Sequence, residues 1–322
     1  NLMFDAVARY FLFGKLGATP WSKYEKIKFI CPVPGYDRHF KILESFGIEM
    51  LCVDILSDGP DMDKVEELAL SDENVKGLIC VPKYSNPTGV TYSPDTVDRI
   101  ARMRPAAEDF RIIWDNAYII HDLEEHGDKL DNIFDVLKKY GHEDMVIEFT
   151  STSKISFPGA GVAAMAAGPN DIELIKGRMN FQTIGPDKLN HLRHAKVFNT
   201  TEKLFSHMKK HAEILRPKFE AVLKMFDKEF SGLDIATWTK PKGGYFISLN
   251  LPGGCAKRVH NLCKEGGLVL TGAGATYPYG IDPNDSNIRI APSLPPVEEL
   301  QQAMEVFTTC LKLAALEKLL NK

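Results

Sequence analysis

The first 170 residues alternate short apolar segments with longer segments of helical periodicity, and this alternation constrains the fold more than any other feature. Strand-like segments followed by helix-like segments are typical of βαβ units, which build parallel sheets. Fully apolar strands such as Leu78-Ile79-Cys80-Val81 favour a sheet that helices cover on both faces. The pattern therefore predicts an α/β fold with a large, mostly parallel (mixed) sheet.

Periodicity and turn residues give the expected bounds. We expect strands over residues 27–31, 49–53, 77–81, 110–114 and 145–149, and helices over residues 39–46, 62–70, 94–103 and 133–140. A further amphipathic helix opens the chain, with an apolar stripe at Leu2, Phe4, Val7, Ala8, Phe11 and Leu12. Because this helix begins without a start signal, we expect further sequence before it, including the N-terminal part of the large domain.

The pattern changes after about residue 199. A helix rich in Lys and Glu is predicted over residues 201–230, and Pro217 inside it is expected to kink or divide it. Short strands are then expected over residues 245–249, 268–271 and 287–290, with helices over 256–263 and 297–320. We therefore predict two domains: a large one over residues 1–200, and a linking helix with a smaller α+β domain over residues 201–322.

Composition excludes several functions. The formal net charge of -4 provides no basic excess to neutralise phosphates, which argues against a nucleic-acid partner. No apolar run approaches the ~18 residues that span a bilayer. The six cysteines are scattered without a C-x-x-C pair, so we expect reduced core thiols of a cytoplasmic protein and no metal site.

Polar groups follow four of the predicted strands. They are Tyr36, Asn86 within Ser85-Asn86-Pro87-Thr88-Gly89, Asp115 and Tyr118 within Asp115-Asn116-Ala117-Tyr118, and Ser151-Thr152-Ser153-Lys154. The carboxyl ends of parallel strands share one edge of the sheet, where ligands bind in open α/β folds. The sequence therefore predicts a site that combines an amide, a carboxylate, two phenols, hydroxyls and one amine.

These motifs carry a family resemblance. N-P-T-G, D-N-A-Y, S-x-S-K, G-G-Y-F and N-I-R-I occur in this order along the whole chain, and the set resembles the fold-type I, class I aminotransferases that depend on pyridoxal 5'-phosphate (PLP). The segments C-P-V-P-G-Y-D-R-H-F and S-K-I-S-F-P-G-A-G-V-A resemble the bacterial aspartate-aminotransferase-like branch related to the MocR group. Each motif alone is weak, whereas five in the right order are specific.

The resemblance implies a role for each residue. Lys154 is similar to the lysine that holds PLP as a Schiff base and then acts as general base. Asp115 resembles the carboxylate beside the pyridine nitrogen, and Asn86 and Tyr118 resemble the donors to the ring oxygen O3′. The remaining assignments are Tyr36 for stacking on the ring, Ser151 and Ser153 for the phosphate, and Arg289, with Asn86, for the substrate α-carboxylate.

The residues alone leave other interpretations open. Lys154 could be a surface lysine, Asp115 a turn residue and Arg289 half of a structural ion pair. For His39, His121 and Asp122 we favour a satisfied structural role, and for the motif Gly243-Gly244-Tyr245-Phe246 a close backbone approach rather than chemistry. One departure from the family is clear: residues 155–162 contain no arginine for the phosphate. Lys188 and Arg193 are the candidate replacements, from this chain or from a neighbouring subunit.

The resemblance implies an amino-acid aminotransferase that uses aspartate and 2-oxoglutarate in a ping-pong reaction. It also implies a homodimer with active sites at the interface. Two alternatives stay open at this point. The same fold supports PLP-dependent lyases and decarboxylases, and aminotransferase-like effector domains occur in MocR-type transcription regulators.

Overall fold

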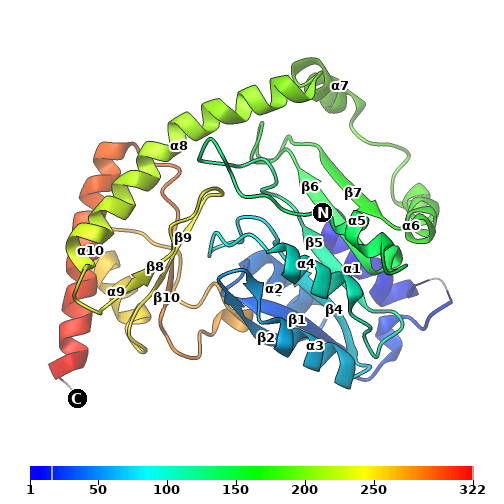
Figure 1. Ribbon diagram of the computed structural model, residues 1–322, viewed down its shortest axis with the longest axis horizontal. Coiled ribbons are helices and arrows are strands. Elements are labelled where there is room, and N and C mark those ends of the chain that lie inside the picture. Colours follow the sequence, from blue (N-terminus) through cyan, green and yellow to red (C-terminus); the bar gives the residue numbers. More distant parts are fainter. Residues whose placement is uncertain (16, 321–322) are drawn as a thin grey trace.

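The computed structural model describes residues 1–15 and 17–320, and its main sheet has seven strands in the order β3-β2-β1-β4-β5-β6-β7 (Figure 1). The five central strands run parallel, and β3 and β7 add antiparallel edges. The bounds are β1 Lys28–Val33, β2 Glu49–Leu56, β3 Gly59–Pro60, β4 Val75–Cys80, β5 Arg111–Asp115, β6 Val146–Ser151 and β7 Ala163–Ala167. The predicted α/β fold with a mostly parallel, mixed sheet is confirmed.

Helices cover both faces of this sheet. One face packs against α3 (Met62–Ser71), α4 (Pro94–Arg102) and α5 (Ile133–Lys138). The other face packs against α1 (Leu2–Phe13) and α2 (Asp37–Ser45). Successive strand residues alternate between the two layers: Ile112 and Trp114 lie in the first, Ile113 in the second. Because both faces are buried, the strands need apolar side chains at consecutive positions.

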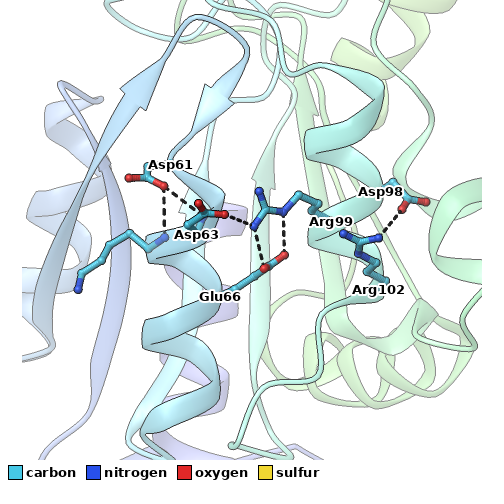
Figure 2. Close-up of polar contacts among 7 residues, drawn as sticks. Asp61, Asp63, Glu66, Asp98, Arg99 and Arg102 are labelled. Carbon is cyan, nitrogen blue, oxygen red and sulfur yellow. Dashed lines mark hydrogen bonds and ion pairs between the residues drawn. The ribbon is translucent and has the colours of Figure 1, made fainter.

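Local signals set the ends of the covering helices and join two of them. Asp61 caps α3 by accepting the backbone N–H of Asp63, and Ser93 caps α4 in the same way one residue before a proline. Arg99 of α4 then reaches α3, with Nη2 2.6 Å from Asp63 Oδ1 and Nε 2.9 Å from Glu66 Oε1 (Figure 2). The outer surface of the α3–α4 layer is therefore linked by charged hydrogen bonds.

A second, antiparallel sheet follows in the order β10-β9-β8, with bounds β8 Thr237–Trp238, β9 Ile247–Asn250 and β10 Asn287–Ile290. It shares an apolar core with α8 (Thr201–Phe230), α9 (Ala256–Glu265) and α10 (Val297–Leu320). Figure 1 shows α8 running from the side of the large sheet to the small one. The division into domains at residue 200 stays a prediction. None of the helices in the described residues is both long and apolar enough to cross a membrane.

One expectation for this region is wrong, and a second is wrong in part. Residues 268–271 form no strand; Leu268 and Leu270 pack against the core from a loop, and β8 supplies the third strand instead. A short apolar run does not distinguish these outcomes. Pro217 lies inside α8 without dividing it. A proline removes one helical hydrogen bond, and the buried side chains of Met208 and Phe219 fix the helix on either side.

Three elements between residues 160 and 200 were not predicted: β7, α6 (Pro169–Gln182) and α7 (Lys188–Val197). β7 reads Ala-Ala-Met-Ala-Ala, which is a composition without strand preference. The stripe expected on α1 is also partly wrong. Val7 is buried as expected, but Phe4 and Leu12 are exposed.

Candidate active site

The site lies where the chain order of the sheet reverses. β1 sits between β2 and β4, so the connections that leave β1 and β4 turn to opposite sides. This arrangement opens a crevice at the carboxyl ends of the strands, which is where open α/β sheets bind ligands. Tyr36 follows β1, Asn86 follows β4, Asp115 ends β5 and Lys154 follows β6. The structure thus brings the predicted residues to one edge.

Lys154 stands in a turn directly after β6, with its Nζ 4.8 Å from the centre of the Tyr118 ring. No side chain in the described parts of the chain forms an ion pair or hydrogen bond with this amine. Burial lowers the pKa of Lys154, and the nearby charge of Asp115 opposes that shift in part. The main chain is held by Tyr245, whose hydroxyl donates to the Lys154 carbonyl at 3.1 Å. An amine in this state is suited to nucleophilic and base chemistry.

Asp115 has a fixed orientation. Its Oδ2 lies 2.8 Å from His39 Nε2, and the two side chains are only 14% and 4% exposed. Because a carboxylate accepts hydrogen bonds, Nε2 of His39 is the donor. The expectation that His39 is a satisfied polar residue is confirmed, but its partner is the acid of the site itself.

Two phenols flank these groups. Tyr118 is buried, and burial together with the charge of Asp115 raises its pKa well above the ordinary value. Burial also raises the pKa of Tyr36, against the opposing charge of Arg38. The Tyr36 ring lies 5.0 Å from that of His39, edge to face. With raised pKa values, both hydroxyls remain protonated at neutral pH and can donate hydrogen bonds.

Arg289 projects from β10 of the small sheet toward the large one. Its Nη1 lies 3.0 Å from Asp37 Oδ1 and 3.2 Å from Asn86 Oδ1, and its side chain is 11% exposed. The guanidinium carbon stands 5.0 Å from the centre of the Phe246 ring. The two sheets therefore meet at the pair of residues to which the sequence assigned substrate binding.

The expected phosphate ligands are only partly placed together. Ser151 Oγ donates to Ser153 Oγ at 3.1 Å, so the two hydroxyls are neighbours. Lys188 and Arg193 lie on α7, and no hydrogen bond joins either of them to these serines in the described residues. Arg193 instead lines a cavity of about 440 Å³ behind the Lys154 turn. The cation for the phosphate stays a prediction.

His121 contradicts the satisfied role expected for it. It is 4% exposed, packs against the rings of Tyr118 and Tyr245, and neither ring nitrogen has a partner in the described part of the chain. Burial and the charge of Lys154 lower the pKa of His121 to about 4, so the imidazole is neutral. The main chain of Lys154 lies near the ring and opposes this lowering of the pKa in part.

Two other expectations are confirmed. Asp122 is satisfied by Lys83 Nζ at 2.9 Å and by the Tyr84 hydroxyl. Gly243 does serve a close approach, because a Cβ there would lie 2.1 Å from the Tyr84 ring.

Four residues of the site region escaped the sequence analysis. His207 donates from Nε2 to the Ile155 carbonyl at 2.7 Å, and His194 Nε2 is hydrogen-bonded to Ser156 Oγ at 2.7 Å, so both hold the turn that carries Lys154. Tyr245 and Asp37, described above, are the others. Asp37 stands in the motif C-P-V-P-G-Y-D-R-H-F, but an acid in the first turn of a helix is ordinarily explained by the helix dipole.

Comparison with known proteins agrees with this geometry. The aspartate amino-transferase family model matches residues 1–322. The chain is 47% identical to an aspartate aminotransferase of Corynebacterium glutamicum, over all of this chain and 74% of that protein. It is 44% identical to a putative aminotransferase of Mycolicibacterium smegmatis, over all of this chain and 75% of that protein.

A solved structure gives the same result. The crystal structure of an aspartate transaminase from Corynebacterium glutamicum superposes with a TM-score of 0.97 at 47% identity, covering 99% of this chain and 75% of that one. The resemblance read from the five motifs is thus confirmed over the full length described. The chain belongs to the aspartate aminotransferase family, and it is an aminotransferase-type enzyme.

Proposed function

We propose that this enzyme is a PLP-dependent aminotransferase that acts on aspartate and 2-oxoglutarate. The observation that carries the proposal is Lys154: a partly buried amine that has no anionic partner among the described residues and lies beside Asp115 and the ring of Tyr118. The similarity to a protein named aspartate aminotransferase supports the choice of aspartate.

The residues present fit PLP. An unpartnered amine suits its aldehyde, and a carboxylate suits its ring nitrogen; Asp115 Oδ2 is bonded to His39, which leaves Oδ1 for a further partner. Asn86 and Tyr118 would donate to the ring oxygen, and Tyr36 would stack on the ring. Ser151 and Ser153 would donate to the phosphate. When bound, PLP supplies an aldehyde for covalent attachment and a ring that withdraws electrons from the substrate Cα.

The side chains of this protein then have separate tasks. Lys154, with its lowered pKa, takes the proton from the substrate Cα and returns it. Asp115, fixed by His39, holds a proton on the pyridine nitrogen. Tyr118, with its raised pKa, remains a hydrogen-bond donor throughout.

Arg289 determines how the substrate is placed. Its planar guanidinium binds the α-carboxylate. Nη1 of Arg289 also donates a hydrogen bond to Asn86 Oδ1 at 3.2 Å, so Asn86 lies beside the guanidinium. The amino acid and the oxo acid both carry this carboxylate, so they use the site in turn, as a ping-pong reaction requires.

We further propose that two copies associate through α6, α7 and the segment between them. Large apolar side chains are exposed there on one stretch of chain: Phe181, Ile184, Leu189, Leu192 and Val197. Surfaces of this kind are typical of protein–protein contacts. Sedimentation equilibrium is expected to give twice the chain mass, and a monomer at micromolar concentration would contradict the proposal.

The test of the proposed function has two parts. Borohydride reduction of the PLP-loaded enzyme, followed by peptide mapping, is expected to place the label on Lys154 alone. The Lys154→Ala variant is expected to lose both the visible absorbance and measurable turnover. A label at another lysine would overturn the assignment.

A panel of amino donors with 2-oxoglutarate separates the reaction types. Glutamate as the product, with aspartate as the best donor, is the expected result. Release of ammonia, pyruvate or carbon dioxide would indicate a lyase or decarboxylase instead.

A further inference from the structure

Arg289 already forms an ion pair with a carboxylate of the protein itself, that of Asp37. Asp37 Oδ1 lies 3.0 Å from Arg289 Nη1, although 252 positions separate the two residues. The Asp37 side chain is 46% exposed, whereas that of Arg289 is 11% exposed. Asp37 therefore faces water, whereas Arg289 is mostly buried.

The contact is made at a single point. Within residues 1–15 and 17–320, only Nη1 of Arg289 is hydrogen-bonded, to Asp37 and to the Asn86 amide oxygen, and Nε is buried without a partner. By contrast, Arg258 holds Glu317 through two nitrogens, at 2.7 and 2.8 Å. Bidentate pairs are the stronger and more oriented ones. Asp37 thus neutralises the charge of Arg289 without forming the two parallel hydrogen bonds that a guanidinium can donate to a carboxylate.

A second carboxylate that binds the same guanidinium would destabilise the ion pair between Asp37 and Arg289. Two carboxylates side by side repel, and the one with better access to water leaves at less cost. Asp37 stands in the first turn of α2, where an acid is also stabilised by the helix dipole. It therefore has an alternative environment, whereas Arg289 has none.

We propose that Asp37 is a displaceable counter-ion, which occupies Arg289 in the substrate-free enzyme and yields it to the α-carboxylate of the substrate. Asp37 then weakens the binding of both the amino acid and the oxo acid, and it favours release of the product by recapturing Arg289. This inference rests on the proposed function, because it takes Arg289 as the carboxylate site.

The competing possibility is that Asp37 orients Arg289 and stays in place when substrate binds through the other nitrogens. The two possibilities predict opposite changes in the affinity for carboxylates when Asp37 is removed. Removing a competitor tightens carboxylate binding, whereas removing an orienting partner weakens it. A variant that keeps the shape of Asp37 but not its charge therefore separates them.

The experiment uses Asp37→Asn in the PLP-loaded enzyme. Succinate is the probe, since it has two carboxylates and no amine to react, and its dissociation constant is measured by calorimetry. We expect succinate to bind about 5- to 10-fold more tightly to Asp37→Asn than to the unmodified protein. The KM values for aspartate and 2-oxoglutarate are expected to fall by a similar factor, with kcat unchanged or lower. An unchanged or larger dissociation constant would overturn the proposal.

Two controls keep the result interpretable. Asp63→Asn removes an exposed acid that also pairs with an arginine, Arg99, and is expected to leave succinate binding unchanged (Figure 2). Asp37→Ser, expected to tighten binding like Asp37→Asn, repeats the test if the first variant folds poorly. If Arg289→Ala binds succinate as tightly as the unmodified protein, the carboxylate assignment of the proposed function fails, independently of Asp37.

Discussion

Two arginines of this protein hold carboxylates in opposite ways. Arg99 lies on the outer surface and is held by two acids of the neighbouring helix, Glu66 through two nitrogens and Asp63 through one (Figure 2). Arg289 lies at the carboxyl edge of the large sheet and has one single-point carboxylate contact, with a buried nitrogen left over. The first arrangement joins two helices. The second leaves binding capacity for a ligand.

Lysines show the same contrast. Lys76 is buried and pairs with Asp109 at 2.9 Å, with the carboxylate also held by Trp21. Lys154 is also largely removed from water, but its nearest described contact is an aromatic ring. Because an unpaired buried charge is costly, such positions are retained where they serve chemistry. Lys76 thus has an anionic partner and Lys154 has none among the described residues, although both lie within the same large domain.

After the loss of Lys154, the largest effect is expected at Asp115. Asp115→Ala should lower kcat by about 10²-fold or more, because the ring nitrogen loses the charge that keeps its proton. Visible absorbance should show that PLP remains bound. Turnover at the unmodified rate would place Asp115 among the structural carboxylates, alongside Asp109.

A smaller effect is expected at the arginine of the site. Arg289→Ala should raise the KM for both the amino acid and the oxo acid by about 10- to 100-fold, the value of a lost charged hydrogen bond. Steady-state kinetics with each substrate varied in turn measures this. Equal KM values in variant and parent would remove Arg289 from the site.

The buried imidazole of His121 leads to a prediction about how the unfolding free energy depends on pH. Its pKa of about 4 in the folded state lies below the ordinary value near 6.5, so the unfolded chain binds more protons between these pH values. Stability from this residue is present above pH 6.5 and is lost as the pH falls toward 4. Between pH 6.5 and 5, the parent should lose about 1–2 kcal/mol more unfolding free energy than His121→Phe.

Urea unfolding at the two pH values measures this difference. The exposed His126 provides the matched control, and His126→Phe should keep the pH dependence of the parent. If the unfolding free energy of His121→Phe depends on pH as strongly as that of the parent, the assignment of a neutral, buried imidazole to His121 is wrong.

The smallest effect is expected at the satisfied arginine. Arg99→Ala should cost no more than about 1 kcal/mol of unfolding free energy, since its partners can turn to water. Its KM and kcat should match those of the parent. A kinetic effect at Arg99 comparable to that at Arg289 would erase the distinction between the two arginines.

The sequence predicted the parts of the molecule that local patterns control. The parallel strands follow from apolar runs, and Lys154, Asp115 and Asn86 follow from their places after those strands. Contacts between segments far apart in the sequence could not be predicted from local patterns. Asp37 and Arg289 lie 252 positions apart, and His207 meets Ile155 only because α8 passes behind the turn. β7 was missed because its alanines have no strand preference and form a strand only by pairing with β6.

The length of α8 has a mechanical consequence. Near its first residues, His207 grips the main chain next to Lys154; toward its last, Phe226 and Phe230 are embedded in the core beneath β9 and β10, which carry Arg289. A helix of 30 residues extends roughly 45 Å and behaves as one stiff rod. A tilt of this helix would therefore move the Lys154 turn and the core of the small sheet relative to each other. One element outside the crevice therefore contacts both the turn that holds Lys154 and the core beneath the strand that holds Arg289.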